Sequence, residues 1–294
     1  MDRLLMIDGH AYAYRAFHAI RSLHSPDGRP TNAIYGFVKM LAKMRAAIEP
    51  THLIVVWDGG LDAARVTQLP QYKAHRPEMP VDLKGQLDEI VEYLMAAGVP
   101  SYCGAGVEAD DYIACLARHA VQAGMTVVIA SSDKDFMQLV SPRVGLLNPN
   151  DKSQAIWTDQ QVRAKAGVGP SQIVDWLSLT GDAVDNIPGV AGVGPKTAAD
   201  LLNQFGSVAA LYERLDEVKS ERLRTALRES ADNVRRNHEL VRLRDDLPCA
   251  FSPDSLAGKP ADVNRLRALY QRWGFKGMLT ALETASSEQQ AILI

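Results

Sequence analysis

The sequence contains little cysteine, no long hydrophobic run and only a small net charge. Its three cysteines, Cys103, Cys115 and Cys249, form neither a C-x-x-C pair nor the spacing of a zinc site, so we expect free, buried, ordinary thiols. No apolar run approaches the roughly 18 residues that a bilayer span needs. The first apolar run has only four residues, too few for a signal peptide. These absences predict a soluble, cytoplasmic protein without a membrane partner.

Length and charge narrow the class further. The 294 residues suggest two domains or one large one, and the 47% apolar content is ample for a buried core, which rules out a wholly disordered chain. The net charge of −3, from 32 basic and 35 acidic residues, argues by itself against a typical basic nucleic-acid binder. If nine of the acids form one metal site, 26 acids remain against the 32 bases. A mildly basic surface around an acidic pocket is then compatible with nucleic-acid binding.

Three short apolar runs each lead into an aspartate. Residues 4–7 precede Asp8, residues 53–57 precede Asp58, and residues 127–132 precede Asp133. Their length and β-branched content predict buried strands, and the helical spacing of segments such as 33–48 and 87–97 predicts helices between them. This alternation indicates a mostly parallel central sheet flanked by helices. Ligands of such sheets collect beyond the carboxyl ends of the strands, where the three aspartates would lie.

The strand pattern stops at about Pro170. Helices are expected over residues 171–180, 195–204, 207–215 and 221–244, separated by Gly, Pro and Asp turns. We therefore expect an α/β domain over residues 1–170 and an all-helical domain over residues 171–294. Residues 59–85 combine prolines with basic side chains and predict a projecting, mobile, basic segment.

Nine carboxylates lie on five separate segments, each at a predicted strand end or helix start. A single acid at such a place is explained as an N-cap or turn residue. Three acids within four residues at one helix start repel one another unless a cation intervenes. The set supplies hard oxygen ligands without cysteine, which favours Mg²⁺ or Mn²⁺ over zinc, and its size favours two metals roughly 4 Å apart, as used in phosphoryl transfer. The nine are Asp8, Asp58, Glu108, Asp110, Asp111, Asp133, Asp135, Asp182 and Asp185.

A glycine-rich loop is the second strong signal. Gly189, Gly192 and Gly194 allow backbone amides to turn outward, and the following proline permits a helix to start there. The new helix N-terminus, with Lys196 and Thr197, would bind a phosphate. A P-loop is disfavoured because a proline separates Gly194 from Lys196 and no strand precedes the loop. A helix-hairpin-helix over residues 186–204, which grips a nucleic-acid backbone without reading bases, is favoured, with a plain interhelical turn as the alternative.

Together these motifs resemble the 5′-nuclease superfamily, specifically the bacterial 5′→3′ exonuclease domain found at the N-terminus of DNA polymerase I, a relative of flap endonucleases. The likeness runs from Leu4 to about Leu282. One departure is that Ala64 stands where the family usually has an aromatic residue before the arginine that matches Arg65. The matching segments are 7–9 with 14–16, 57–58, 72–77, 106–111, 132–135 and 181–198.

The resemblance implies a PIN-like (resolvase-like) α/β fold, in which residues 59–85 form a helical arch over the site, and a C-terminal helical domain with the helix-hairpin-helix. It implies that Lys73 and Arg76 neutralise the scissile phosphate, that Tyr72 stacks on a base, and that Arg15 positions a phosphate. It also suggests K⁺ at the glycine-rich loop. A first metal would be held by Asp8, Asp58, Glu108 and Asp110, and a second by Asp133, Asp135, Asp182 and Asp185, with Asp111 between them.

The implied function is that of a Mg²⁺-dependent, structure-specific 5′→3′ exonuclease and flap endonuclease, with two metal ions and Mn²⁺ as a substitute. The expected partner is DNA with a 5′ flap or a 5′ end at a duplex junction, or an RNA/DNA primer, bound by a monomer. A PIN-type ribonuclease and a non-catalytic DNA-junction binder stay open as alternatives. A haloacid-dehalogenase-type phosphatase is disfavoured, because position 10 is His10 and not aspartate. The chain is either a free-standing nuclease or part of a polymerase I.

Overall fold

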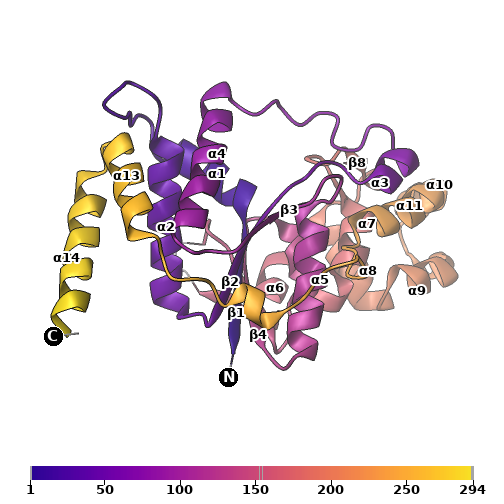
Figure 1. The fold of residues 1–294 in the computed structure, drawn as a ribbon. Helices are drawn as coiled ribbons and strands as arrows, with labels where there is room; N and C mark the ends of the chain where they lie inside the picture. The colour runs from indigo at the N-terminus through magenta and orange to yellow at the C-terminus, as the bar shows by residue number, and fades with distance from the viewer. Residues whose placement is uncertain (1, 152, 154, 293–294) are drawn as a thin grey trace. The chain divides into compact units, whose positions relative to one another are not determined.

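The computed structural model describes residues 2–151, 153 and 155–292. The chain folds into two compact units, each assembled from separated stretches of sequence (Figure 1). The first unit comprises residues 1–58, 78–103 and 250–294, and the second comprises residues 59–77 and 104–249. The domain boundary expected near residue 170 does not coincide with the division into these two units, and it stays a prediction.

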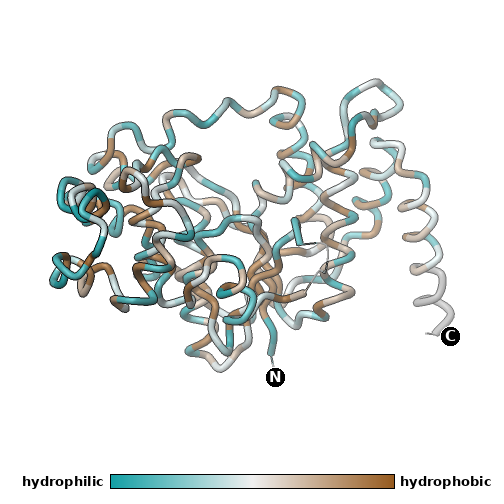
Figure 2. Tube along the Cα trace, turned by 180° about the vertical axis from the view of Figure 1, so that it is seen from behind, coloured by the Kyte–Doolittle hydropathy of each residue, from teal (hydrophilic) through white to brown (hydrophobic). Residues whose placement is uncertain are grey.

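The first unit contains three parallel strands, β1 (Arg3–Asp8), β2 (His52–Trp57) and β3 (Ser101–Cys103), in the order β3-β2-β1. Every residue from Leu4 to Ile7 is fully buried, as expected for a sheet covered on both faces. Helix α1 (Gly9–Ala19) packs on α2 (Asn32–Ile48), which packs on α4 (Val81–Ala96). In Figure 2, hydrophobic and hydrophilic residues alternate along the helical turns, and the outlying connecting segments are largely hydrophilic.

The last part of the chain also belongs to the first unit. Helices α12 (Pro253–Leu256), α13 (Val263–Trp273) and α14 (Lys276–Ile292) follow one another, and α13 packs on α4. Trp273 is almost fully buried, and the guanidinium of Arg272 contacts carboxylates of Glu89 and Glu92 on α4. These contacts join residues that are distant in sequence, and no local sequence pattern predicts them.

The second unit contains β4 (Thr126–Ala130) and β5 (Val144–Leu147), which are parallel, and β6 (Ile156–Trp157), which is antiparallel to β5. Its helices in this part are α3 (Ala63–Gln68), α5 (Ala109–Gln122), the 3₁₀ turns η1 (Lys134–Leu139) and η2 (Pro170–Gln172), and α6 (Asp159–Ala166). Helix α5 packs on β4. The predicted fold class, a mostly parallel sheet flanked by helices followed by a helical region, is confirmed.

The helical part of the second unit begins with α7 (Ile173–Thr180) and a two-stranded hairpin of β7 (Gly181–Asp182) and β8 (Ile187–Pro188). It continues with α8 (Pro195–Phe205), α9 (Val208–Glu213), η3 (Leu215–Glu217), α10 (Glu221–Glu229) and α11 (Ala231–Val241). The single helix expected over residues 221–244 is wrong: it is broken at Ser230. Serine favours helix starts over helix interiors, because its hydroxyl competes for backbone hydrogen bonds.

Two further expectations can be compared with the structure. All three cysteines are free, as predicted, but only Cys115 is buried. Cys103 is exposed because it ends the edge strand β3, and Cys249 is half-buried, so the expected burial is wrong for these two residues. Over the residues that the structure describes, no helix combines the length and the apolar character required to cross a bilayer.

Candidate metal and nucleic-acid site

Asp8 and Asp58 lie at the carboxyl ends of the neighbouring parallel strands β1 and β2 in the first unit. Asp8 is the last residue of β1, and its side chain caps α1 by accepting a hydrogen bond from the Ala11 amide at 3.0 Å. The Asp58 amide donates to Nδ1 of His10 at 3.1 Å, which leaves the imidazole proton on Nε2. Burial lowers the pKa of His10, although Asp58 acts in the opposite direction. This ring is therefore neutral at physiological pH and positions the Asp58 backbone.

Glu108 is the N-cap residue of α5 and one of the most buried charged residues of the second unit. It is 2% exposed, and its Oε2 accepts from the Lys73 ammonium at 2.6 Å and from the Tyr72 hydroxyl at 3.1 Å. Oε1 accepts from the Asp62 amide at 3.0 Å. Burial alone would raise the pKa of Glu108, but the charges of Lys73 and Arg65 outweigh it and the pKa lies below its ordinary value. Glu108 is consequently ionised and tied to the basic segment.

Asp111, one turn further along α5, has a different set of contacts. Both of its oxygens accept from the Arg65 guanidinium, at 2.7 and 2.8 Å, and Oδ1 also accepts from the Arg244 amide at 2.9 Å. Arg65 itself is 6% exposed and donates further to the carbonyls of Leu240 and Arg242. Both oxygens of Asp111 therefore already accept hydrogen bonds from the protein. The family resemblance had placed this residue between two metals.

Four acids from two segments of the second unit come together near the end of β4. Oxygens of Asp135, Asp182 and Asp185 all lie within 4.8 Å of one another. Burial, reinforced by neighbouring carboxylates, raises the pKa of Asp133 and raises that of Asp135 well above its ordinary value. Oδ1 of Asp135 is buried without a hydrogen-bond partner among the described residues. A convergent group of hard oxygens with an unpaired lone pair fits a divalent cation such as Mg²⁺ or Mn²⁺.

Residues 69–77 of the basic segment are anchored to this cluster by hydrogen bonds that involve their backbone. The Lys73 amide donates to the Asp185 carbonyl at 3.0 Å, and the Asn186 side chain donates to the Gln71 carbonyl at 2.9 Å. The Lys73 ammonium lies 4.0 Å from the Asp185 carboxylate, and Arg76 donates to that carboxylate at 2.6 Å. Lys73 therefore stands between Glu108 and Asp185. Its burial and these contacts differ from the projecting, solvated segment that the sequence suggested.

Tyr72 and Arg15 occupy less exposed positions than their expected roles suggest. Tyr72 is 4% exposed, and burial, together with the charge of Glu108, raises its pKa. Its stacking on a nucleic-acid base stays a prediction that requires the ring to become accessible. Arg15 lies on α1 in the first unit and is partly buried. Its contact with a phosphate likewise stays a prediction.

The glycine-rich loop joins the β7–β8 hairpin to α8. A side chain at Gly189 would place its Cβ 2.2 Å from the Thr180 carbonyl oxygen, so the hairpin requires glycine there. Asn237 of α11 is fully buried and donates to the Ser178 carbonyl at 3.1 Å and the Pro188 carbonyl at 2.6 Å, which fixes the hairpin on α7 and α11. Gly194 is the N-cap of α8. Beyond it, the exposed Lys196 donates to the carboxylate of the exposed Asp200 at 3.0 Å, and its ammonium is accessible to solvent.

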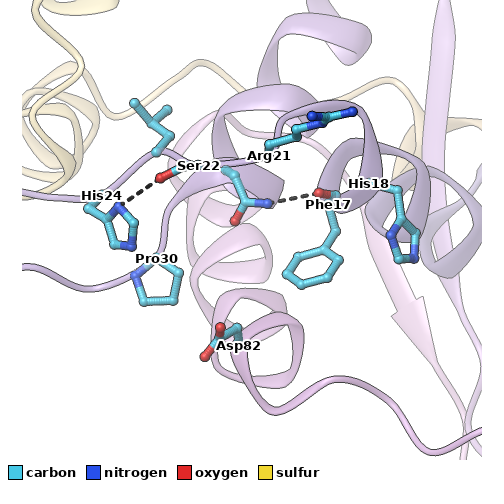
Figure 3. A pocket seen from close by; sticks show the side chains of 9 residues that line it. Phe17, His18, Arg21, Ser22, His24, Pro30 and Asp82 are labelled. Atoms are coloured by element: carbon cyan, nitrogen blue, oxygen red, sulfur yellow. Dashed lines mark hydrogen bonds between the residues drawn. The ribbon is translucent and has the colours of Figure 1, made fainter.

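Two cavities accompany these elements, one in each unit. In the second unit, a cavity of about 520 Å³ lies between the basic segment and the β7–β8 hairpin and is lined by Gln71, Asp182, Asn186 and Gly189, among others. It therefore connects the acidic cluster to the glycine-rich loop. In the first unit, a pocket of about 260 Å³ lies between the end of α1, the loop that follows it and the start of α4 (Figure 3). Its charged lining comes from Arg21 and Asp82, with two histidines, and includes none of the predicted site residues.

Comparison with known proteins gives consistent matches along most of the chain. The family model described as the 5′-3′ exonuclease N-terminal resolvase-like domain matches residues 3–167, and that of the 5′-3′ exonuclease C-terminal SAM fold matches residues 168–264. A 5′-3′ exonuclease of Aquifex aeolicus (strain VF5) is 39% identical, and the match covers 96% of each chain. DNA polymerase I of Bacillus caldotenax is 40% identical over 98% of this chain, which spans about a third (33%) of that protein's length.

Solved structures share the fold at lower identity. The T5 D15 protein co-crystallised with metal ions has a TM-score of 0.67 at 22% identity, and the match covers 95% of this chain and 99% of that one. The catalytic core of Rad2 in complex with DNA substrate has a TM-score of 0.60 at 16% identity, with 96% and 93% covered. The arrangement of strands and helices described above is thus shared with proteins whose structures contain metal ions or DNA.

Proposed function

Because the chain belongs to the 5′-3′ exonuclease family, we propose that it is a structure-specific 5′ nuclease that cleaves DNA where a 5′ flap meets a duplex. Its products would carry 5′-phosphates, and its work would be the removal of flaps or RNA primers during replication and repair. The observation that carries the proposal is the convergence of Asp135, Asp182 and Asp185 within 4.8 Å of one another, with one buried carboxylate oxygen unpartnered among the described residues. Such a cluster is costly unless a cation joins it.

Two divalent ions, Mg²⁺ or alternatively Mn²⁺, are part of this proposal. When bound, such ions activate a water molecule and stabilise the charge that develops on the attacking and leaving oxygens. Asp133 would join the three clustered acids around one ion. The family resemblance assigns Asp8, Asp58, Glu108 and Asp110 to the other ion.

Lys73 and Arg76 would receive the scissile phosphate. Both cations already compensate acidic residues of the second unit: Lys73 contacts Glu108, and Arg76 contacts Asp185. Once divalent ions neutralise those carboxylates, the two cations become available to an arriving phosphate group, which is an equally good partner for them. Burial alone would lower the pKa of Lys73, but the charges of Glu108 and Asp185 outweigh it and raise the pKa above its ordinary value, so the ammonium stays protonated. Burial also keeps water from screening its interaction with a phosphate.

The glycine-rich loop would hold the duplex beside the cut. The amides at the N-terminus of α8 and the exposed Lys196 offer contacts to the phosphate backbone of DNA, and such contacts do not depend on base sequence. The cavity that connects the hairpin to the acidic cluster gives the strand a path between the two. We include K⁺ on the loop carbonyls, a monomeric state and a cytoplasmic location in the proposal. Binding should follow DNA shape and weaken steeply with added salt.

The test is cleavage of a 5′-labelled flap substrate with and without Mg²⁺, followed by sizing of the labelled product. We expect Mg²⁺-dependent release of a fragment that ends near the junction. Asp133→Asn should reduce turnover far more than DNA affinity, because this residue is assigned to a metal and not to the duplex. Exposed Glu213→Gln serves as the control for loss of one negative charge in the same unit.

Two outcomes would favour the alternatives. Faster cleavage of single-stranded RNA than of flap DNA indicates a PIN-type ribonuclease. Tight binding of flap DNA without hydrolysis under any divalent metal indicates a junction-binding protein that does not catalyse. Equal activity of Asp133→Asn and the native chain would remove that residue from the metal site.

A further inference from the structure

A second group of metal-ligating side chains lies on α5, away from its acidic first turn. Cys115 and His119 are four residues apart on one face of this helix. Cys249, from the chain that follows α11, meets them, so that Sγ of each cysteine and a ring nitrogen of His119 lie within 4.8 Å of one another. All three belong to the second unit. None of them takes part in the proposed cleavage, and the linear spacing of the cysteines concealed their meeting.

The distances in this group are close to those of a tetrahedral metal. Sγ of Cys115 lies 3.7 Å and Sγ of Cys249 lies 3.8 Å from Nδ1 of His119. Zinc bonds of about 2.3 Å to sulfur and about 2.0–2.1 Å to nitrogen at a tetrahedral angle separate the two ligand atoms by about 3.6 Å. Both observed separations exceed that value by no more than about 0.2 Å. An ion therefore needs only a small contraction of the group.

The surroundings are suited to a soft cation. Cys115 is buried, while His119 and Cys249 are half-buried, so an ion could enter and a water molecule could reach it. The Cys115 thiol donates to the Leu247 carbonyl at 3.2 Å, and Nδ1 of His119 lies 2.9 Å from the Cys115 carbonyl oxygen. Metal binding would release the two thiol protons, move the His119 ring proton from Nδ1 to Nε2, and replace the contacts with the Leu247 and Cys115 carbonyls by coordinate bonds.

We propose that Cys115, His119 and Cys249 form a zinc site, with water as the fourth ligand. Two thiolates and one imidazole are a ligand set for Zn²⁺, whereas the oxygens of the acidic cluster suit Mg²⁺ or Mn²⁺. The two sites of the second unit would therefore take different metals.

The proposed zinc site connects α5 to residues 244–249, a segment whose first amide donates to Asp111. Residues 244–249 run along α5 from the Arg244 amide, which donates to Asp111, to Cys249. Closing the zinc site fixes both ends of this segment. We therefore expect zinc to stabilise the second unit without taking part in hydrolysis.

The test uses Co²⁺ as a spectroscopic substitute for zinc on the full chain, kept reduced, with excess Mg²⁺ to occupy the carboxylates. Thiolate-to-cobalt charge-transfer absorption arises only from sulfur ligands, so it separates this site from the acidic cluster. We expect a band that saturates at about one equivalent and that Zn²⁺ removes by displacing the cobalt. Cys249→Ser and His119→Gln should each weaken the band strongly. Cys103→Ser, which alters the exposed cysteine of the first unit, should leave it unchanged.

Counting reactive thiols gives an independent measurement. Alkylation of the zinc-loaded native chain should modify Cys103 alone, and alkylation after zinc removal should also modify the half-buried Cys249, while the buried Cys115 reacts only when the chain is unfolded. Retained Mg²⁺-dependent flap cleavage by Cys249→Ser shows that this variant is folded. Absence of a sulfur band in the native chain, or its survival in Cys249→Ser, would overturn the proposal. A disulfide between Cys115 and Cys249 in the freshly isolated chain, before any reductant is added, would also overturn it. Each of these results leaves the assignment of the acidic cluster intact.

Discussion

Asp135→Asn should stabilise the metal-free protein. The oxygens of Asp135, Asp182 and Asp185 lie within 4.8 Å of one another, and two unit charges at that distance repel by about 3.5 kcal/mol at an effective dielectric constant of about 20. Lys134, 3.2 Å from Asp182, and Arg76, 2.6 Å from Asp185, offset part of this repulsion. We therefore expect removal of the Asp135 charge to raise the free energy of unfolding by about 2 kcal/mol.

The gain should depend on pH. Burial, together with the charges of neighbouring carboxylates, raises the pKa of Asp135 well above its ordinary value, which is about 3.9. The folded chain then holds this proton more tightly than the unfolded chain, so native stability falls as the pH rises from about 4 through the raised pKa. The Asn variant escapes this loss. Its advantage should be absent below about pH 4 and complete above the raised pKa.

Thermal unfolding of metal-stripped protein, followed by circular dichroism across this pH range, measures the effect. About 2 kcal/mol corresponds to a rise in Tm of roughly 4–8 °C at the alkaline end. Exposed Glu213→Gln removes the same charge from the same unit and should change Tm little. Added Mg²⁺ should stabilise the native chain and leave the Asn variant nearly unchanged. A variant less stable than the native chain without metal at high pH would refute the view that these carboxylates repel.

Three further predictions concern residues around the cluster. Lys73→Ala should slow single-turnover cleavage of flap DNA, because it removes a buried cation next to the cluster; an unchanged rate would count against its role. Asp111→Asn should cost about 3–5 kcal/mol in denaturant unfolding by leaving Arg65 uncompensated, with Mg²⁺ affinity, measured by calorimetry, little altered; a large loss of affinity would make Asp111 a ligand. Lys196→Ala should lower the slope of log affinity against log salt by about one, while exposed Lys219→Ala leaves it unchanged.

The strand-end aspartates could be predicted because their signal is local. An apolar run of strand length followed by Asp8 or Asp58 fixes both the element and the place where it ends, and β1 and β2 end there. The start of α5 beyond Glu108 is equally local. Parallel pairing of β1 with β2 then brings two of these ends to one edge of a sheet, which is a consequence of topology and not of any one residue.

The remaining features depend on contacts between distant segments. Arg65 and Asp111 are 46 residues apart, and nothing near either one indicates a buried bidentate pair. The burial of Lys73 against Glu108 is likewise invisible in a basic, proline-rich stretch that reads as solvated surface. Cys249 lies 130 residues from His119. The break at Ser230 had a signal, because Ser-Ala-Asp resembles a helix start, but the surrounding helix-forming residues outweighed it.

We propose that the carboxylates of the second unit gather to hold divalent ions. Anomalous scattering from crystals soaked in Mn²⁺ locates such ions. We expect a manganese peak bounded by Asp135, Asp182 and Asp185, which Asp182→Asn abolishes together with cleavage. Manganese bound elsewhere, with these three carboxylates left without an ion while Mn²⁺-dependent cleavage persists, would contradict it.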